Sequence, residues 1–126
     1  MIFKLTEEQQ AIQEAARDFA NTVLLPGVIE RDRSMIYPQD QVKQMSAMGF
    51  MGMMVDPEFG GLGMDTLSYA IVIEELAKID ASAAIIMSVN NSLVAWGINE
   101  YGSQLQKEKY LTKISSGDWM GCFFFL

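Results

Sequence analysis

An all-α fold is predicted by three features of the sequence. Apolar residues recur with helical spacing along most of the chain, helix-capping boxes are present at Thr6–Gln9 and Ser103–Gln106, and only 3 prolines occur in 126 residues. Half of the residues are hydrophobic, which favours an ordered, helix-rich globule. A chain of this length is expected to form one compact domain that buries about two-thirds of the surface its unfolded form exposes.

The N-terminal third is predicted to contain three helices. The first runs from about Glu7 to Leu25 and begins at the capping box of Thr6. The pair Pro26-Gly27 interrupts the helical hydrogen bonds, so residues 28–33 form a bent continuation or a second short helix. Proline also suits the first turn of a helix, which predicts a third one from Pro38 to Gly49.

The glycine-rich segment from Asp56 to Asp65 is the strongest break in the helical pattern. It lacks the Gly-Lys-Ser/Thr ending of a phosphate-binding loop and the spacing of a dinucleotide-binding loop, which favours a tight turn between helices. Asp65 is expected to cap the next helix, from Thr66 to Ile79. Within it Glu74 and Glu75 are neighbours and cannot share a helix face, so we expect solvated charges and not an acid/base pair.

The longest apolar stretch runs from Asp80 to Glu100 and carries no charge between its acidic ends. A helix that is apolar on nearly every side is buried, and we expect Ser82 to cap this one and Gly102 to end it in the left-handed conformation. Buried amides and hydroxyls are costly unless they are hydrogen-bonded, so its polar stripe must face backbone groups, water, a ligand or another domain. The stripe consists of Ser88, Asn91 and Ser92.

The same helix carries a row of apolar residues at near-helical spacing: Ile85, Val89, Leu93 and Trp96. The row could line a pocket for an apolar ligand, but such a row is more often ordinary core. Composition and spacing leave both interpretations open.

The end of the chain changes character. After the capping box at Ser103, an amphipathic helix is expected to direct Tyr110, Leu111 and Ile114 inward. The run from Asp118 to Leu126 is apolar and aromatic, which suits a buried strand. A single strand would expose its edge, so we expect a helical domain at 1–117 and the start of a β-domain at 118–126, as at the front of a longer protein.

Composition excludes several function classes. A net charge of −7 without a Lys/Arg cluster argues against nucleic acid. The uncharged stretch is near membrane-spanning length, but Ser, Asn and Gly interrupt it and no basic anchors flank it, so we expect no membrane partner. The start of the chain does not resemble a signal peptide, and the lone Cys122 cannot form an internal disulfide, which together predict a reducing, cytoplasmic compartment.

Catalytic and metal-binding residues are not apparent. The sequence has no histidine, which removes His-dependent triads, Cys–His nucleophiles and the common zinc sites. Without a His partner, Cys122 is expected to act as a small hydrophobe. We therefore assign no catalytic residue and no metal ligand.

Seven stretches, in this order, resemble the N-terminal helical domain of the acyl-CoA dehydrogenases, and together they cover nearly the whole chain. The first three are L-T-E-E-Q-Q (5–10), L-L-P-G-V-I-E-R-D-R (24–33) and D-P-E-F-G-G-L-G-M-D (56–65). The others are I-V-I-E-E-L-A-K-I-D-A-S (71–82), M-S-V-N-N-S-L (87–93), Y-G-S-Q-L-Q-K-E-K-Y-L (101–111) and G-D-W-M-G-C-F (117–123). The stretch M-S-V-N-N-S-L is most similar to the short-chain, butyryl-type branch.

The resemblance implies a flavoenzyme that desaturates an acyl-CoA at the α,β position. In that family a β-domain and a second helical domain follow the N-terminal one and hold FAD between them, and electrons pass to an electron-transfer flavoprotein. The catalytic carboxylate comes from the C-terminal domain. The resemblance therefore assigns no catalytic residue to this chain, and we expect these 126 residues alone to bind no flavin and to be inactive.

For single residues, the resemblance implies that Ile85, Val89 and Leu93 lie at or near the floor of the acyl-chain pocket, where branched side chains favour a short acyl group. It also implies that Phe123 lies on a flavin-contacting first strand of the β-domain. The sequence departs from the family at 124–126, where Phe-Phe-Leu replaces the usual Ala-Leu-Ser/Thr of the family. A non-enzymatic helical interaction module is the alternative, and exposed apolar faces predict a homo-oligomer in either case.

Overall fold

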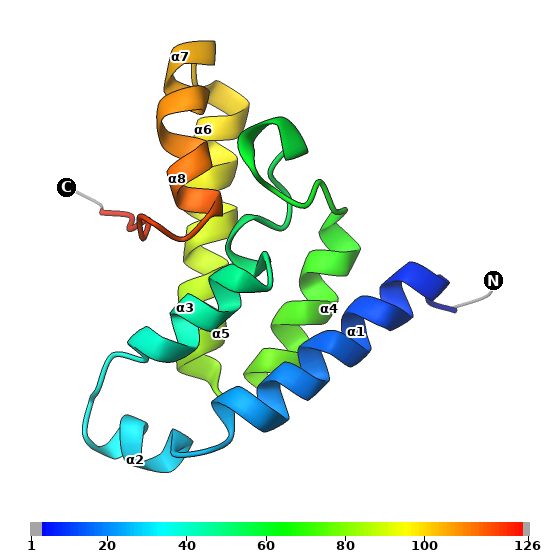
Figure 1. The fold of residues 1–126 in the computed structure, drawn as a ribbon, viewed down its shortest axis with the longest axis vertical. Coiled ribbons are helices and arrows are strands. Elements are labelled where there is room, and N and C mark those ends of the chain that lie inside the picture. Colours follow the sequence, from blue (N-terminus) through cyan, green and yellow to red (C-terminus); the bar gives the residue numbers. More distant parts are fainter. Residues whose placement is uncertain (1–3, 125–126) are drawn as a thin grey trace.

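The computed structural model describes residues 4–124, which fold into helices and contain no strand (Figure 1). In chain order the helical elements are α1 (Glu7–Phe19), η1 (Ala20–Leu24), α2 (Val28–Arg33), α3 (Gln39–Ala47), η2 (Phe50–Gly52), η3 (Pro57–Phe59), α4 (Thr66–Ala77), α5 (Ala81–Ser88), η4 (Val89–Ala95), α6 (Trp96–Tyr101), α7 (Gln104–Gln106), η5 (Lys107–Leu111) and α8 (Thr112–Ser115). The segments η1, η4 and η5 are π-helical turns, whereas η2 and η3 are short 3-10 turns. The predicted all-α class is confirmed.

Helix α4 packs between α1 and α5, and the three helices form the main layer of the fold (Figure 1). The elements α5, η4 and α6 join into one central helix, Ala81–Tyr101, against which α3 and η2 pack from another side. The elements η5 and α8 then return along its far end. The central helix is thus the element that contacts most of the others.

Local capping chemistry follows the sequence prediction at three helix starts. Thr6 and Gln9 form a reciprocal capping box, with backbone-to-side-chain distances of 3.0 and 3.1 Å, and Ser103 begins α7 in the same way. Asp65 accepts the Ser68 N–H at 2.7 Å and caps α4. The glycine loop contains tight turns, because the Gly60 N–H donates to the Pro57 carbonyl at 3.0 Å and the Gly61 N–H to the Asp56 carbonyl at 3.2 Å.

The predicted ends of the central helix are wrong. Asp80, and not Ser82, is its cap, since the Asp80 carboxylate accepts the Ala83 N–H at 3.0 Å. Gly102 has φ −73° and ψ 145°, which is extended and not left-handed backbone. The chain leaves this helix without a left-handed residue because the next helix begins at once, with Ser103 as its cap.

The predicted strand at 118–126 is not formed by residues 118–124, which have no regular structure, and residues 125 and 126 lie outside the described part. A strand completes its backbone hydrogen bonds only with a partner strand, and the described residues offer none.

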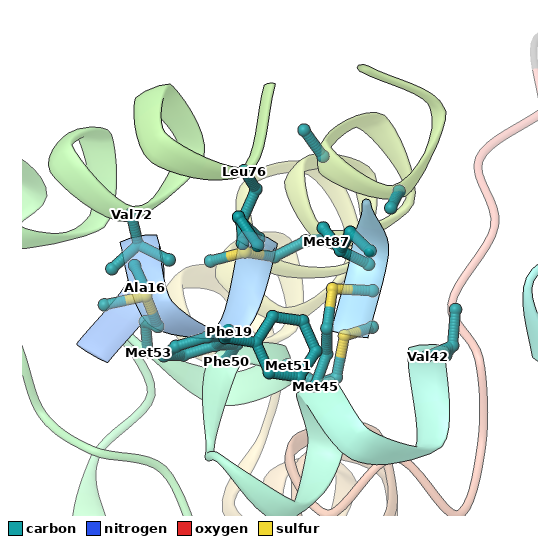
Figure 2. Close-up of a cluster of buried hydrophobic side chains, with 14 residues drawn as sticks. Ala16, Phe19, Val42, Met45, Phe50, Met51, Met53, Val72, Leu76 and Met87 are labelled. Atoms are coloured by element: carbon teal, nitrogen blue, oxygen red, sulfur yellow. The ribbon is translucent and has the colours of Figure 1, made fainter. Parts of the chain in front are cut away.

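The main core lies where α1, α3, η2, α4 and α5 meet (Figure 2). The rings of Phe19 and Phe50 meet edge to face, with centroids 5.7 Å apart. Around them the fully buried methionines are Met45, Met51, Met53 and Met87. Methionine side chains fill irregular gaps well, which suits a core built between helices of different length and direction.

The central helix is less enclosed than its composition predicts. By length and composition it could cross a membrane, yet a single helix of this kind is weak evidence, and one-third of its most apolar window (33%) is buried inside this domain. Its buried side chains include Asn90 and Asn91, which bond to backbone carbonyls of the same domain. The prediction of burial on nearly every side is wrong, because the neighbouring helices cover only part of its circumference.

Candidate functional site

The apolar row on the central helix faces outward. Ile85 is 62% exposed, Leu93 46% and Trp96 47%, and Val89 between them is partly buried. Residues three and four positions apart share one side of a helix, so the four side chains form one exposed face. They are not part of the core clusters of this domain, so the interpretation as ordinary core is not supported by the structure.

One end of this row lies in a hollow of about 500 Å³. Ile85, Ile86 and Ser82 of α5 form one wall, and α2 with the segment that follows it forms the other. Val89 and Leu93 lie outside this hollow. The structure therefore brings the three predicted pocket residues onto one face, but only Ile85 lines the hollow, and it remains mainly exposed there.

An ion pair that the sequence did not reveal forms part of the lining of the hollow. Arg31 Nη2 lies 3.1 Å from Asp80 Oδ2, and both side chains are largely buried. Arg31 also donates to the carbonyl of Pro26 at 2.7 Å and to that of Leu24. The pair joins α2 to the start of the central helix. Because the partners are 49 residues apart, no local sequence pattern predicts it.

The predicted polar stripe faces the domain interior. Asn91 accepts the Met53 N–H at 2.8 Å and donates to the carbonyls of Phe50 and Met87 at 2.8 and 3.0 Å. The hydroxyl of Tyr69 on α4 donates to Ser88 Oγ at 3.1 Å. Among the partners left open by the sequence, backbone groups and a neighbouring helix are the ones observed.

Asn90 is a buried polar residue that the sequence analysis missed. It is fully buried and donates to the carbonyl of Met51 at 2.8 Å, while its Oδ1 accepts the Gly121 N–H at 2.8 Å. Neighbouring residues of an α-helix point in directions about 100° apart, so Asn90 was not counted with its neighbour Asn91 in the predicted stripe. The signal available in the sequence was the Asn-Asn pair itself, and the π-helical turns of η4 accompany the burial of both amides.

The prediction that Glu75 is a solvated charge is wrong. Glu74 is exposed, but Glu75 is only 3% exposed and accepts two hydrogen bonds from Arg17, at 3.1 and 3.2 Å. Lys78 and Gln13 also donate to Glu75, at 2.9 and 3.1 Å. The hydrogen bond from Arg17 is the main cause that holds the pKa of the Glu75 carboxyl below its usual value. The arrangement joins α1 to α4 and leaves no free carboxylate for chemistry.

The candidate metal and cofactor residues were sought among the described residues. Residues 4–124 contain no group of three or more Cys, Asp or Glu residues that could hold a metal ion. Phe123, which the resemblance assigned to a flavin-contacting strand, is 50% exposed in the segment after α8. It does not line the hollow beside Ile85, and the neighbouring Cys122 is exposed.

Comparison with known proteins gives a consistent family. Residues 6–118 match the family model "Acyl-CoA dehydrogenase, N-terminal domain". The mouse short-chain specific acyl-CoA dehydrogenase, a mitochondrial protein, is 41% identical over 95% of this chain and 29% of its own length. The short-chain specific acyl-CoA dehydrogenase of Clostridium acetobutylicum is 39% identical over 98% of this chain and 32% of its own length.

Solved structures agree. Butyryl-CoA dehydrogenase from Megasphaera elsdenii superposes with a TM-score of 0.87 at 38% identity, over 95% of this chain and 32% of that one. A chain in a structure of the electron transferring flavoprotein of Acidaminococcus fermentans superposes with a TM-score of 0.89 at 43% identity, over 93% of this chain and 31% of that one. This chain thus spans about a third of the length of the relatives it matches. The family model, the identities and the superpositions together show that the chain belongs to the acyl-CoA dehydrogenase family, as its N-terminal helical domain.

Proposed function

We propose that this chain is the N-terminal domain of a short-chain acyl-CoA dehydrogenase, and that Ile85, Val89 and Leu93 form one wall of its acyl-chain pocket. The outward orientation of this row carries the proposal. Apolar side chains that are exposed together on a rigid helix are suited to meeting an apolar partner, and an acyl chain is such a partner.

The preference for a short acyl chain is supported by similarity and by size. The relatives named above that are dehydrogenases carry the short-chain or butyryl designation. Branched or bulky side chains along the row reduce the depth left for a ligand. Each methylene that a longer chain cannot bury loses about 0.8 kcal/mol and adds a clash.

The remaining parts of the reaction are assigned outside these residues. Phe123, the one proposed flavin contact, lies in a segment without regular structure. We propose that FAD, the catalytic carboxylate and the contact with an electron-transfer flavoprotein are supplied by other parts of a complete enzyme. These 126 residues alone are then inactive.

A non-enzymatic interaction module is the second candidate. It is supported by exposed apolar side chains that do not belong to the row, among them Met35 at 91% and Phe124 at 82%. Such surfaces favour self-association.

For the compartment we propose the cytoplasm, supported by the single Cys122, which has no second cysteine in this sequence to form an internal disulfide.

Replacing the N-terminal domain of the Megasphaera elsdenii butyryl-CoA dehydrogenase by this chain separates the two candidates. The proposal predicts a yellow chimera that oxidises butyryl-CoA, while the purified chain alone is colourless and inactive. A folded, flavin-loaded chimera without activity would contradict the enzymatic role. Flavin-dependent activity of the chain alone would contradict the division of roles.

A further inference from the structure

The segment Asp118–Phe124 forms no regular structure, and in Figure 1 it leaves the end of α8 and runs outward towards the C-terminus. Its first residues, up to Gly121, contact the helices. Its Trp119 N–H donates to the Lys113 carbonyl at 3.0 Å, and the Trp119 ring lies 6.3 Å from that of Tyr110. Both contacts come from η5 and α8, which precede the segment. The hydrogen bond of Gly121 N–H to Asn90 Oδ1, at 2.8 Å, ties it to the central helix.

The side chain of Asn90 forms hydrogen bonds with three other parts of the chain: η2, α8 and the segment Asp118–Phe124. Its amide Nδ2 donates to the Met51 carbonyl of η2 at 2.8 Å and to the Ile114 carbonyl of α8 at 3.4 Å. Its Oδ1 accepts from Gly121. A carboxamide carries two donor hydrogens on its NH2 group and a separate acceptor oxygen, which matches this set of two carbonyls and one N–H. Because Asn90 is fully buried, each of these groups would be costly to leave without a partner.

Gly121 fits this contact for a steric reason. A Cβ atom at position 121 would lie 2.7 Å from Val94 Cγ1, one helical turn beyond Asn90. Real carbon atoms do not approach so closely, so a side chain there would push the segment off the helix. A glycine and a buried asparagine are therefore both needed for the short distance between segment and helix.

We infer that Asn90 is the positioning residue of the segment Asp118–Phe124: with Gly121 it fixes where the chain leaves the helical domain, and so where Phe123 lies. The consequence for a flavin near Phe123 rests on the proposed function. The positioning itself rests on the contacts of Asn90 and Gly121 alone. Under the proposed function, one helix would set both the acyl-chain wall and the start of the flavin side.

Asn91 provides a matched control. It is 2% exposed, lies on the same helix and bonds to backbone groups of η2 and of its own helix, but it makes no described contact with the segment. Replacing either asparagine by alanine removes a buried carboxamide of the same size. The two variants therefore lose similar packing, and only Asn90→Ala loses the contact with Gly121 and the longer one with the Ile114 carbonyl.

The test measures hydrogen exchange of the amide at position 121 by NMR in the purified chain. It also measures the fluorescence of Trp119 in a Trp96→Phe background, since the sequence contains two tryptophans. Asn90→Ala is expected to speed this exchange about tenfold more than Asn91→Ala does, at equal global stability, and to shift the Trp119 emission. Equal exchange in the two variants would overturn the inference.

A second pair of variants leaves both asparagines in place and applies if Asn90→Ala does not fold. Gly121→Ala is expected to loosen the segment, because the added Cβ would lie 2.7 to 2.9 Å from Val94 Cγ1, Cβ and Cγ2. Gly121→Ala combined with Val94→Gly is expected to restore slow exchange, because the second change removes all three of these carbon atoms. A Gly121→Ala chain with unchanged exchange, or a double variant without recovery, would contradict the inference. Neither result depends on flavin or acyl-CoA, so failure here is distinct from failure of the proposed function.

Discussion

The Glu75 carboxylate of α4 accepts two hydrogen bonds from the Arg17 guanidinium of α1, 58 residues away in sequence. Glu75 is almost fully buried, whereas Arg17 is half exposed. This contact joins α1 to α4, and α4 in turn packs against α5, the first part of the central helix.

Replacing Glu75 by glutamine should lower the free energy of unfolding by about 1–2 kcal/mol at pH 7, because the charge-assisted bonds become weaker while the shape is kept. The value is modest since the cationic partners can return to water. Glu74→Gln is the control, because Glu74 is 67% exposed, and it should change stability by less than about 0.5 kcal/mol. Urea denaturation measures both. Equal effects of the two variants would contradict the assigned role of Glu75.

The same contact predicts a dependence of stability on pH. Arg17 holds the pKa of the Glu75 carboxyl below its usual value in the folded state. The Asp65 carboxyl also has a lowered pKa, chiefly through its hydrogen bond from the Ser68 backbone. Since both folded-state values lie below the unfolded ones, their contribution is complete above about pH 5 and is lost as the pH falls through the folded-state pKa.

Urea midpoints measured from pH 7 down to pH 3 should therefore fall in the wild-type chain and fall less in Glu75→Gln. Parallel curves for the two proteins would exclude Glu75 as a source of the acid sensitivity.

The glycine loop predicts two different costs for the same substitution. Gly60 has φ +81° with open space around it, so Gly60→Ala should cost about 1–2 kcal/mol for the left-handed backbone alone. At Gly61 a Cβ atom would overlap the Val55 carbonyl, which also accepts the Gly63 N–H. Gly61→Ala should therefore cost more than about 3 kcal/mol. Thermal denaturation of the two variants tests the order, and a larger loss for Gly60→Ala would contradict the loop geometry.

Exposure of the apolar row predicts that its side chains contribute little to stability. Ile85→Ala should change the free energy of unfolding by less than about 0.5 kcal/mol, because Ile85 is mainly exposed. Met87, two positions along the same helix, is fully buried, and Met87→Ala should cost about 2–5 kcal/mol. A large loss of unfolding free energy for Ile85→Ala would mean that the row packs as core and would contradict its outward orientation.

The exposed apolar surfaces also predict self-association of the purified chain. Static light scattering is expected to give a mass above that of one chain, and substitution of Leu93 and Trp96 by serine should lower it, since both are nearly half exposed. Thr22→Ser, on the exposed side of η1, is the control and should leave the mass unchanged. A clean monomer at high protein concentration would contradict this prediction.

Features encoded by a few adjacent residues could be predicted from the sequence. The caps at Thr6, Asp65 and Ser103 depend on side chains that reach their own backbone, so the pattern and the contact coincide. The cap of the central helix was misplaced because both Asp80 and Ser82 have suitable oxygens, and the choice depends on where the preceding helix ends.

Features that depend on distant partners could not be predicted in this way. Three such contacts join residues that are 31 to 58 positions apart: Glu75 with Arg17, Arg31 with Asp80, and Asn90 with Gly121. The outward orientation of Ile85 and Leu93 depends on which sides the neighbouring helices cover, and an evenly apolar helix does not specify this. The resemblance identified the family from the sequence. That Ile85, Val89 and Leu93 form a wall of the acyl-chain pocket remains a proposal.

The acyl-chain preference of the chimera tests the central claim most directly. The measurement is the ratio of kcat/KM for octanoyl-CoA to that for butyryl-CoA, with the wild-type row and with Ile85→Ala and Leu93→Ala combined. The proposal predicts a ratio below one for the wild-type row and a rise of about tenfold in the double variant, because a longer chain can then bury more methylene groups. A ratio above one, or a ratio that the alanine substitutions leave unchanged, would contradict the assignment of this helix face to the acyl chain.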